Sequence, residues 1–363
     1  MAKFMDILTI VNGKNQKKVE NPNGKYPIYG SGGIMGYADD FICDKNTVVI
    51  GRKGSINKPI YVEVPFWNVD TAFGLVANKS VLESKYLYYF CENFDFEQLN
   101  TTVTIPSLTK ANLQNIKIPL PSLKEQRKIA AVLDKVSDLI AKRRQQLEKL
   151  DLLVKAKFVE MFGSCKTNPK NWSVCNLGEV AQVGSSKRVF VEELKESGIP
   201  FYRGTEVGAL AEGKEIKPEL FITEEHYQKL CDATGKPQIG DLLMPSICSD
   251  GRIWVVNSEE PFYFKDGRVL WIHDINKDFN SIFLLYTLKD RIMMDYDSIA
   301  SGTTFAELKI FSLKQCKIFV APIELQNKFA DFVEQTEKTK TSIKESLEKL
   351  ETLKKALMQE YFG

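Results

Sequence analysis

Clusters of lysine, arginine, amide and hydroxyl side chains follow several short apolar runs in this sequence. The segment from Asn12 to Lys18 mixes three lysines with Asn and Gln, and a second pair of cations lies between two glycines in 51–54. Lysine and arginine bind phosphate groups, whereas Asn and Gln match the hydrogen-bonding edge of adenine. We therefore expect exposed turns that contact nucleic acid. The candidate contact residues in this half are Lys14, Gln16, Lys17, Lys18, Arg52 and Lys53.

Similar residue types recur in the second half of the chain. Basic segments at 185–188 and 250–252 follow apolar runs at roughly matching places, and the hydroxyl-rich segments 101–104 and 301–304 correspond to each other. A single basic turn is ordinarily just solvated surface, so the argument for nucleic-acid contact depends on this recurrence. The further candidate contacts are Thr101, Thr102, Ser186, Lys187, Arg188, Arg203, Arg252, Arg268, Thr303 and Thr304.

Motifs for methyl transfer and for phosphate binding are missing from these segments. Adenine methyltransferases that flip their target base hold it with a [DN]-P-P-[FYW] loop. The segments NPNG (21–24) and NKPI (57–60) lack the second proline and the aromatic residue. The glycine-rich run GSGGIMG (30–36) does not have GxGxxG spacing and is not followed by Lys-Ser or Lys-Thr, so we interpret it as a turn.

Motifs for hydrolysis and metal binding are equally weak. Glu215-Ile216-Lys217 is a nuclease-like ExK triplet without a preceding Pro-Asp, and we assign it to the surface. The two histidines, His226 and His273, have no serine or cysteine context that indicates a catalytic triad, and two are too few for a typical zinc site. We assign no catalytic, cofactor-binding or metal-binding residues.

Composition is typical of a globular protein from a reducing compartment. The chain has 363 residues, a formal net charge of +2 and 44% hydrophobic residues, which suffices for two or three domains. Seven cysteines without a CxxC pair indicate free thiols. Neither an apolar run of about 18 residues nor a signal-peptide layout is present, so we expect a cytoplasmic protein with no membrane contact. The low net charge favours local, site-specific contacts over bulk electrostatic binding.

A long charged segment with one apolar seam, from Ser122 to Gly163, organises the chain around these clusters. Ser122 and Glu125 form a capping box, and Gly163 supplies a C-terminal stop. Apolar residues recur at a spacing near 3.5, which predicts one long helix that needs a partner helix. The seam residues are Ile129, Leu133, Val136, Ile140, Leu147, Leu150, Val154 and Met161.

Residues 322–363 repeat this segment at an offset of 200 residues and are the predicted partner. An internal repeat of this size defines the architecture as domain, helix, domain, helix. Matching pairs include Gln126 with Gln326, Lys128 with Lys328, Ala130 with Ala330, Leu147 with Leu347, Leu150 with Leu350, and Phe162-Gly163 with Phe362-Gly363. The match extends upstream from Leu108, Leu113, Lys117 and Ile118 to Leu308, Leu313, Lys317 and Ile318.

Both globular segments carry β-rich runs in the same order, separated by Gly, Asn and Pro turns. We therefore predict an α+β fold with two similar domains and a pseudo-two-fold repeat. The predicted boundaries are 1–118 and 164–320 for the domains and 119–163 and 321–363 for the spacer helices.

The connectivity predicts how the helices run. Because a compact domain keeps its termini close together, the second helix should run antiparallel to the first, with one domain at each end of a coiled coil about 57 Å long for ~38 residues. Polar residues at seam positions either extend to solvent, fix the register or contact partner proteins. They are Arg143, Lys157, Thr336, Lys340 and Lys354.

With this plan the sequence resembles the specificity subunit of Type I restriction–modification systems over essentially the whole chain. The resemblance is carried by KIPLPSLKEQRKIAAVLD (117–134), VAPIELQNKFADF (320–332) and the Phe-Gly pair that ends each helix. The second copy differs in having Leu325 before Gln326 and one residue fewer after the proline.

The resemblance implies a non-catalytic subunit with two target-recognition domains, each of which reads half of a bipartite double-stranded DNA site. It also implies that the helices set the spacing and that two modification (methyltransferase) subunits dock on them. The presence of restriction (ATP-dependent endonuclease) subunits and the target site stay open. Two other classes also stay open: an interaction scaffold that never binds DNA, and an enzyme that uses the glycine-rich loops.

Overall fold

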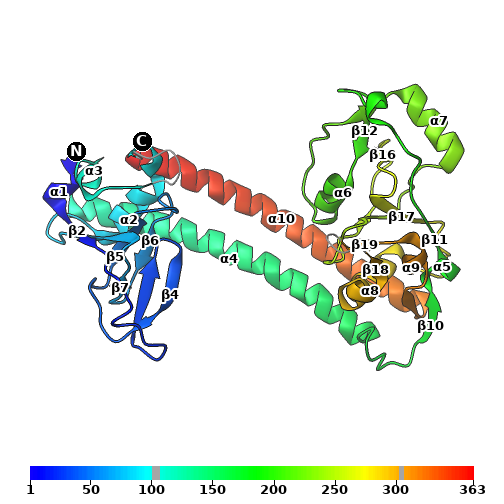
Figure 1. The fold of residues 1–363 in the computed structure, drawn as a ribbon, viewed down its shortest axis with the longest axis horizontal. Helices are drawn as coiled ribbons and strands as arrows, with labels where there is room; N and C mark the ends of the chain where they lie inside the picture. Colours follow the sequence, from blue (N-terminus) through cyan, green and yellow to red (C-terminus); the bar gives the residue numbers. More distant parts are fainter. Residues whose placement is uncertain (100–106, 302–305) are drawn as a thin grey trace. The chain divides into compact units, whose positions relative to one another are not determined.

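The computed structural model describes residues 1–99, 107–301 and 306–363 (Figure 1). The chain forms two compact units, one of residues 1–146 with 342–363 and the other of residues 147–341. Each unit thus contains one globular domain, the first part of the long helix that follows it, and the last part of the other long helix. The predicted α+β class is confirmed, and among the described residues no helix combines the length and apolarity needed to cross a membrane.

The first domain is built from short strands on which a few helices pack. Its strands are β1 (Ala2–Lys3), β2 (Leu8–Asn12), β3 (Tyr26–Gly30), β4 (Gly33–Ala38), β5 (Thr47–Gly51), β6 (Ile60–Val62), β7 (Trp67–Asn68), β8 (Ala72–Ala77) and β9 (Lys117–Ile118). Its helices are α1 (Phe4–Ile7), α2 (Ser84–Asn93), α3 (Lys110–Gln114) and a 3₁₀ turn at Phe96–Leu99, and α4 (Leu123–Phe162) follows.

The second domain repeats this order with insertions. Its strands are β10 (Ser173–Asn176), β11 (Gln182–Gly184), β12 (Ile199–Tyr202), β13 (Phe221–Ile222), β14 (Leu242–Pro245), β15 (Trp254–Val255), β16 (Tyr263–Phe264), β17 (Val269–His273), β18 (Ala300–Ser301), β19 (Glu307–Leu308) and β20 (Lys317–Val320). Its helices are α5 (Leu177–Val180), α6 (Gly204–Ala211), α7 (Glu224–Thr234), α8 (Ser281–Ile299), α9 (Ile310–Lys314) and a 3₁₀ turn at Val191–Glu193, and α10 (Ile323–Phe362) follows.

The sheets show that the two domains share one frame. The four-stranded sheet has the order β2-β8-β5-β6 in the first domain and β11-β17-β14-β15 in the second. The three-stranded sheets, β4-β3-β7 and β13-β12-β16, each contain one parallel pair, β3 with β7 and β12 with β16. The first and last strands of each domain also pair, as β1 with β9 and β10 with β20. This confirms the prediction of one fold used twice.

A buried glutamine joins each domain to the helix that follows it. Gln126 is fully buried; its Oε1 accepts a hydrogen bond from the Glu83 N–H (2.9 Å) at the start of α2, and its Nε2 donates to the carbonyls of Val81 and Pro121. Gln326 is also fully buried and makes the same contacts with the Asn280 N–H (2.9 Å) and with two carbonyls of its own unit. The repeat of these glutamines is therefore explained by a shared hydrogen-bonding role.

The two long helices run antiparallel within each unit. In the first unit Arg144 forms an ion pair with Glu351 (2.6 Å), and in the second Lys340 pairs with Asp151 (2.8 Å). The last aromatic residue of each helix packs on the opposite domain's helix, Phe162 on Phe283 and Phe362 on Tyr86.

Polar residues at the seam find partners within their own unit. Lys354 pairs with Glu92 at 2.8 Å, and the Thr336 hydroxyl donates to the Phe332 carbonyl at 2.8 Å. Lys340 has a raised pKa: burial opposes the shift, but hydrogen bonds to Asp151 and Glu337 outweigh it. Of these residues, Lys340 joins α10 to α4 through Asp151, which favours the register-fixing interpretation for that position, whereas the Thr336 bond lies within α10.

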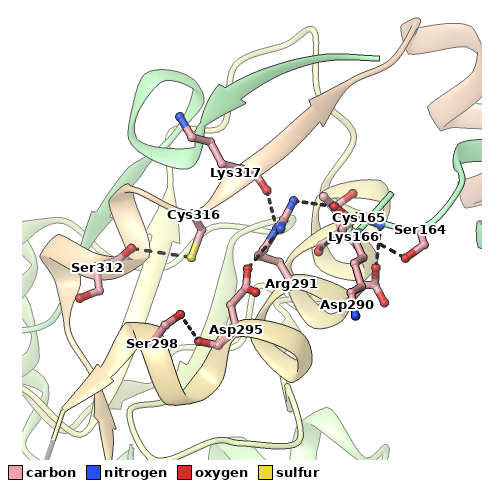
Figure 2. A network of polar contacts seen from close by, with 11 residues as sticks. Ser164, Cys165, Lys166, Asp290, Arg291, Asp295, Ser298, Ser312, Cys316 and Lys317 are labelled. Atoms are coloured by element: carbon pink, nitrogen blue, oxygen red, sulfur yellow. Dashed lines mark hydrogen bonds and ion pairs between the residues drawn. The ribbon is translucent and has the colours of Figure 1, made fainter. Parts of the chain in front are cut away.

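Arg291 ties the segment after α4 to the second domain (Figure 2). Its Nη2 donates to the Cys165 carbonyl (3.0 Å), its Nε donates to the Lys317 carbonyl (3.3 Å), and its Nη1 pairs with Asp295 (3.2 Å). The several donors of one guanidinium can join three elements at once, here α8, β20 and the linker. The predicted helix stop is confirmed at Gly163, whose φ of +83° suits glycine.

Candidate nucleic-acid interface

The topology brings the predicted contact segments to one edge of each four-stranded sheet. In the first domain β2 and β5 both run antiparallel to β8 and flank it on either side. The C-terminal ends of β2 and β5 therefore lie at the same edge as the start of β8. The loop after β2 and the turn after β5 are the two basic segments predicted for this domain. The equivalent strands β11, β14 and β17 produce the same convergence in the second domain.

The loop after β2, residues 13–18, which we call the lysine loop, is fixed through its backbone. The Lys14 N–H donates to the Asn68 carbonyl (2.8 Å), and Trp67 Nε1 donates to the Lys14 carbonyl (3.0 Å). Gly13 is required here, because a Cβ at this position would lie 1.7 Å from the Val69 carbonyl oxygen. The side chains of Lys14, Lys17 and Lys18 are exposed, and Gln16 is half-buried.

The turn after β5, residues 51–54, which we call the basic turn, also has a fixed backbone. The Arg52 N–H donates to the Thr71 carbonyl (2.8 Å), and the Arg52 carbonyl accepts from the Leu108 N–H (2.9 Å). Lys53 forms a β-bridge with Ser107, and the Arg52 guanidinium lies 5.8 Å from the ring centre of Phe73. The two cations are exposed. The predicted contacts Thr101 and Thr102 lie outside the described residues.

In the second domain the cations take different positions on the same frame. The Ser246 N–H donates to the Arg268 carbonyl (2.9 Å), and the Ser246 carbonyl accepts from the Leu308 N–H (2.8 Å). Ser246 therefore occupies the place of Arg52, and Arg268 occupies the place of Thr71. Arg252 also follows β14, but it lies six residues beyond Ser246. The basic turns recur at the same sheet edge without residue-by-residue equivalence.

Three of the predicted arginines line one cleft in the second unit. Arg203, Arg252 and Arg268, with Lys265, surround a volume of about 570 Å³, which we call the arginine cleft. Four cations and one carboxylate, that of Glu206, line the cleft, so its lining carries a net positive charge that suits an anionic ligand. The predicted contacts Thr303 and Thr304 lie outside the described residues.

The segment 185–188 lies at the same sheet edge as the cleft. The Ser186 hydroxyl donates to the Phe264 carbonyl (2.5 Å), and the Lys187 N–H donates to the Tyr263 hydroxyl (3.0 Å). Arg188 pairs with Asp266 at 3.2 Å and remains largely exposed. Ser186 is thus committed to the fold, whereas the side chains of Lys187 and Arg188 are exposed to solvent.

Carboxylates hold the arginines of the cleft. Arg203 pairs with Glu206 (2.6 Å), Arg252 pairs with Asp250 (2.9 Å), and Arg268 pairs with Glu307. Burial alone would raise the pKa of Glu206, but hydrogen bonds from the Arg203 side chain and backbone lower it to about 2. The carboxylate is therefore charged at neutral pH and fixes the direction of the guanidinium.

Several features of this interface were missed at the sequence level. Lys265 lies in the segment KDGR (265–268), whose turn residues beside a cation were a usable signal. The pairing of Glu307 with Arg268 joins residues far apart in sequence, and no local pattern indicates it. The assignment of Glu215 and Lys217 to the surface is confirmed, since both side chains are exposed.

The amino-acid sequence of this chain is similar to those of known specificity subunits. Residues 1–150 and 169–352 match the family described as Type I restriction modification DNA specificity domain. A Haemophilus influenzae protein named as a type I restriction enzyme specificity subunit is 27% identical over 94% of this chain and 88% of its own length. The specificity subunit MjaVIII of Methanocaldococcus jannaschii is 25% identical over 99% of this chain and 90% of its own length.

Two solved structures have a similar fold. A Type I restriction–modification S subunit from M. genitalium has a TM-score of 0.66 and 20% identity, with 100% of this chain and 95% of that chain covered. A chain from a structure titled for complex assembly and conformational transition of the type I R-M system has a TM-score of 0.58 and 17% identity, with 99% and 96% covered.

Proposed function

Because the chain belongs to the Type I restriction modification DNA specificity family, we propose that its two domains each read one half of a bipartite double-stranded DNA site. The chain is a non-catalytic specificity subunit, and other chains supply the modification and restriction chemistry. One observation carries the proposal of two half-sites. Both domains direct the same loops to the same sheet edge, but with different side chains, as expected for two readers with different targets.

The contacts proposed for each half-site follow from the geometry of each edge. In the first domain the lysine loop and the basic turn contact phosphates and bases, and in the second domain the arginine cleft does so. An arginine can donate two hydrogen bonds to the O6 and N7 atoms of guanine, and a lysine can neutralise a phosphate. Sequence preference therefore resides in the side chains of these loops, while the sheets only position them.

We further propose that two modification subunits dock on the long helices. Both helices expose apolar side chains that no core explains, such as Leu139 and Leu353 in the first unit and Leu152, with 63% of its surface exposed, in the second. Exposed apolar residues along a helix favour contact with a partner protein. Restriction subunits would join this complex in the cytoplasm, where the thiols of all seven cysteines stay reduced.

The helix pair is proposed as the ruler between the half-sites. In the second unit Asp151 lies opposite Lys340, so Val154 and Glu337 occupy the same level of the pair. We would insert seven residues after each of these two positions, which keeps the apolar seam in phase. The insertion adds about 10.5 Å of helix, equivalent to roughly 3 base pairs at ~3.4 Å each.

We expect less modification at the original site and a preference for a spacer longer by about two to four base pairs. Binding should weaken as well, because the added pairs rotate one half-site by about 100° around the duplex, at ~10.5 pairs per turn. Methylation-aware sequencing of cells that carry the variant with its modification subunits measures both effects. A fully active variant with an unchanged spacer would show that the docked subunits, and not the helices, set the distance. If the complex with the wild-type chain methylates no bipartite site, the proposed function itself is contradicted.

A further inference from the structure

The first domain carries a tight hairpin, formed by β3 and β4, that ends in glycines; we call it the glycine hairpin. Tyr29 pairs with Ile34 and Gly30 pairs with Gly33, which leaves Ser31 and Gly32 as a two-residue turn. Gly33 has a φ of +117°, which residues that carry a side chain rarely adopt, and a Cβ built there would have no atom within 4 Å. The tip is therefore a compact projection open to solvent.

Two large apolar residues follow this tip and are exposed. Ile34 has 55% and Met35 has 61% of its surface exposed, although each belongs to a strand. Single exposed apolar residues are common, but two together beside the tip of an exposed hairpin form a small apolar surface that is suited to contact with another molecule. The fold of the first domain does not require them, because the cores of that unit are built from other residues.

The glycine hairpin lies against both basic segments of the first domain. At the basic turn, a Cβ added to Gly51 would lie 3.0 Å from the Cβ of Ser31, so the tip touches the start of that turn. At its other side, Tyr29, the partner of Ile34, pairs with Asn68 of β7, and the Asn68 carbonyl accepts from the Lys14 N–H (2.8 Å) at the start of the lysine loop. The apolar pair is thus continuous with the proposed phosphate-binding cations, whose positive charge selects a polyanion as the occupant.

We propose that Ile34 and Met35 make apolar contact with the bases of the half-site that the first domain reads. The inference rests on the proposed function and adds a specificity-determining pair to it. Apolar side chains contact the methyl group of thymine or press between base steps, and both contacts depend on sequence. The cations on either side would hold the phosphates while the hairpin enters the groove between them. The second domain has no such hairpin at this place, because β12 is followed by α6.

The test uses the complete complex of this chain with its modification subunits. The probe is a duplex that contains the site found by methylation-aware sequencing, compared with duplexes mismatched in one half. Met35→Ala and Ile34→Ala are measured singly. The matched control is Val64→Ala, since Val64 is 49% exposed and follows β6, which ends beside the start of β5 at the opposite end of the sheet.

Met35→Ala should bind the cognate duplex roughly tenfold more weakly, the loss expected when one large apolar side chain is no longer buried. The slope of log affinity against log salt concentration should stay unchanged, because no phosphate contact is lost. The difference in affinity between the cognate duplex and a mismatched duplex should become smaller only when the mismatch lies in the half-site read by the first domain. If Met35→Ala and Ile34→Ala bind each duplex with the same affinity as the control Val64→Ala, the inference is overturned.

Two further outcomes separate this inference from its premise. If the variants assemble poorly with the modification subunits, as measured by mass photometry, the hairpin contacts protein, and the inference is overturned. If the wild-type complex binds all duplexes equally well, the proposed function fails as well. If the wild-type complex distinguishes the cognate from the mismatched duplexes and the variants bind as the wild type does, only the role of the hairpin is removed.

Discussion

In the first domain the cations at the sheet edge carry no ion pairs among the described residues, whereas in the second domain the three arginines of the cleft each contact a carboxylate. Three lysines of the lysine loop, Lys14, Lys17 and Lys18, are exposed and form no ion pair within the part of the chain that the structure describes. Among the same residues, the guanidinium of Arg52 has no carboxylate partner and lies over the ring of Phe73. The loops that carry these groups start from equivalent strands and end at equivalent hydrogen bonds. The domains therefore share their strands but differ in side chains and in inserted elements such as α6 and α7.

This difference indicates that one frame can support two ways of reading DNA. Mobile lysines bind phosphates with little directional preference, so their contribution depends strongly on salt. An arginine that a carboxylate holds in one direction can offer a fixed pair of donors to a base edge. We therefore expect the first half-site to depend more on electrostatic and apolar contacts and the second on directed hydrogen bonds.

The shared frame is tested by removing the glutamine that joins each domain to its helix. Gln126→Leu and Gln326→Leu should each lower the free energy of unfolding by about 3 kcal/mol, because each leaves one partly buried N–H and two carbonyls without their partner. Urea unfolding measures the size of the effect. Hydrogen exchange should increase at the start of α2 in the first variant and at the start of α8 in the second.

The control for this pair is Gln145→Leu, an exposed glutamine on α4, which should leave stability nearly unchanged. If only one of the two buried glutamines proves important, the domains do not use the same anchor. The two domains would then differ in how they attach to their helices, and not only in their side chains.

The difference in side chains is tested by comparing half-sites. Arg252→Ala with Arg268→Ala should cost about 1–3 kcal/mol and relax recognition only in the half read by the second domain. Arg52→Ala with Lys53→Ala should act on the other half and, if both contact phosphates, reduce the slope of log affinity against log salt by about 2. Methylation-aware sequencing and binding at several salt concentrations measure these effects. Altered recognition of both halves by either pair would contradict separate readers.

Much of the fold was predictable because it depends on local patterns and on the repeat. Capping by Ser122, the stop at Gly163 and the apolar seam follow from short-range rules, and the Ser122 hydroxyl does accept from the Glu125 N–H at 3.3 Å. The repeat does not predict the length of α8, which has 19 residues and a buried face that continues to Ile292, whereas its counterpart α2 has 10 residues. The seam at Leu147 and Leu150 is only half-buried, which the periodicity alone did not indicate.

The candidate site was less predictable because its geometry is made by pairings across the chain. Basic segments could be identified by composition, but their convergence depends on β2 and β5 flanking β8. The equivalence of Ser246 with Arg52 depends on two backbone hydrogen bonds that sequence similarity did not reveal. Likewise, no motif distinguishes Arg268, which a distant carboxylate holds, from Arg52, which has no carboxylate partner among the described residues.

The smallest expected effect concerns the pH dependence of the carboxylate that holds Arg203. The pKa of Glu206 is lowered to about 2 in the folded chain, against an ordinary value of 4.5. A carboxyl group with a depressed pKa stabilises the fold fully above pH 4.5, and this stabilisation is lost as the pH falls towards 2. Glu206→Gln removes the titrating group, so the stability difference between wild type and variant should shrink by about 1–2 kcal/mol over this range, after allowance for solvent screening.

Urea unfolding followed by tryptophan fluorescence suits this measurement, because Trp172, Trp254 and Trp271 all lie in the second unit. Glu225→Gln is the matched control: its pKa is lowered by a hydrogen bond from Lys229, but the pair is fully exposed on α7 and should contribute little. Parallel loss of stability in wild type and Glu206→Gln would mean that Glu206 does not hold Arg203 in solution. Arg203 would then have no fixed direction, and the distinction between held arginines in the second domain and unpaired lysines in the first would rest on Arg252 and Arg268 alone.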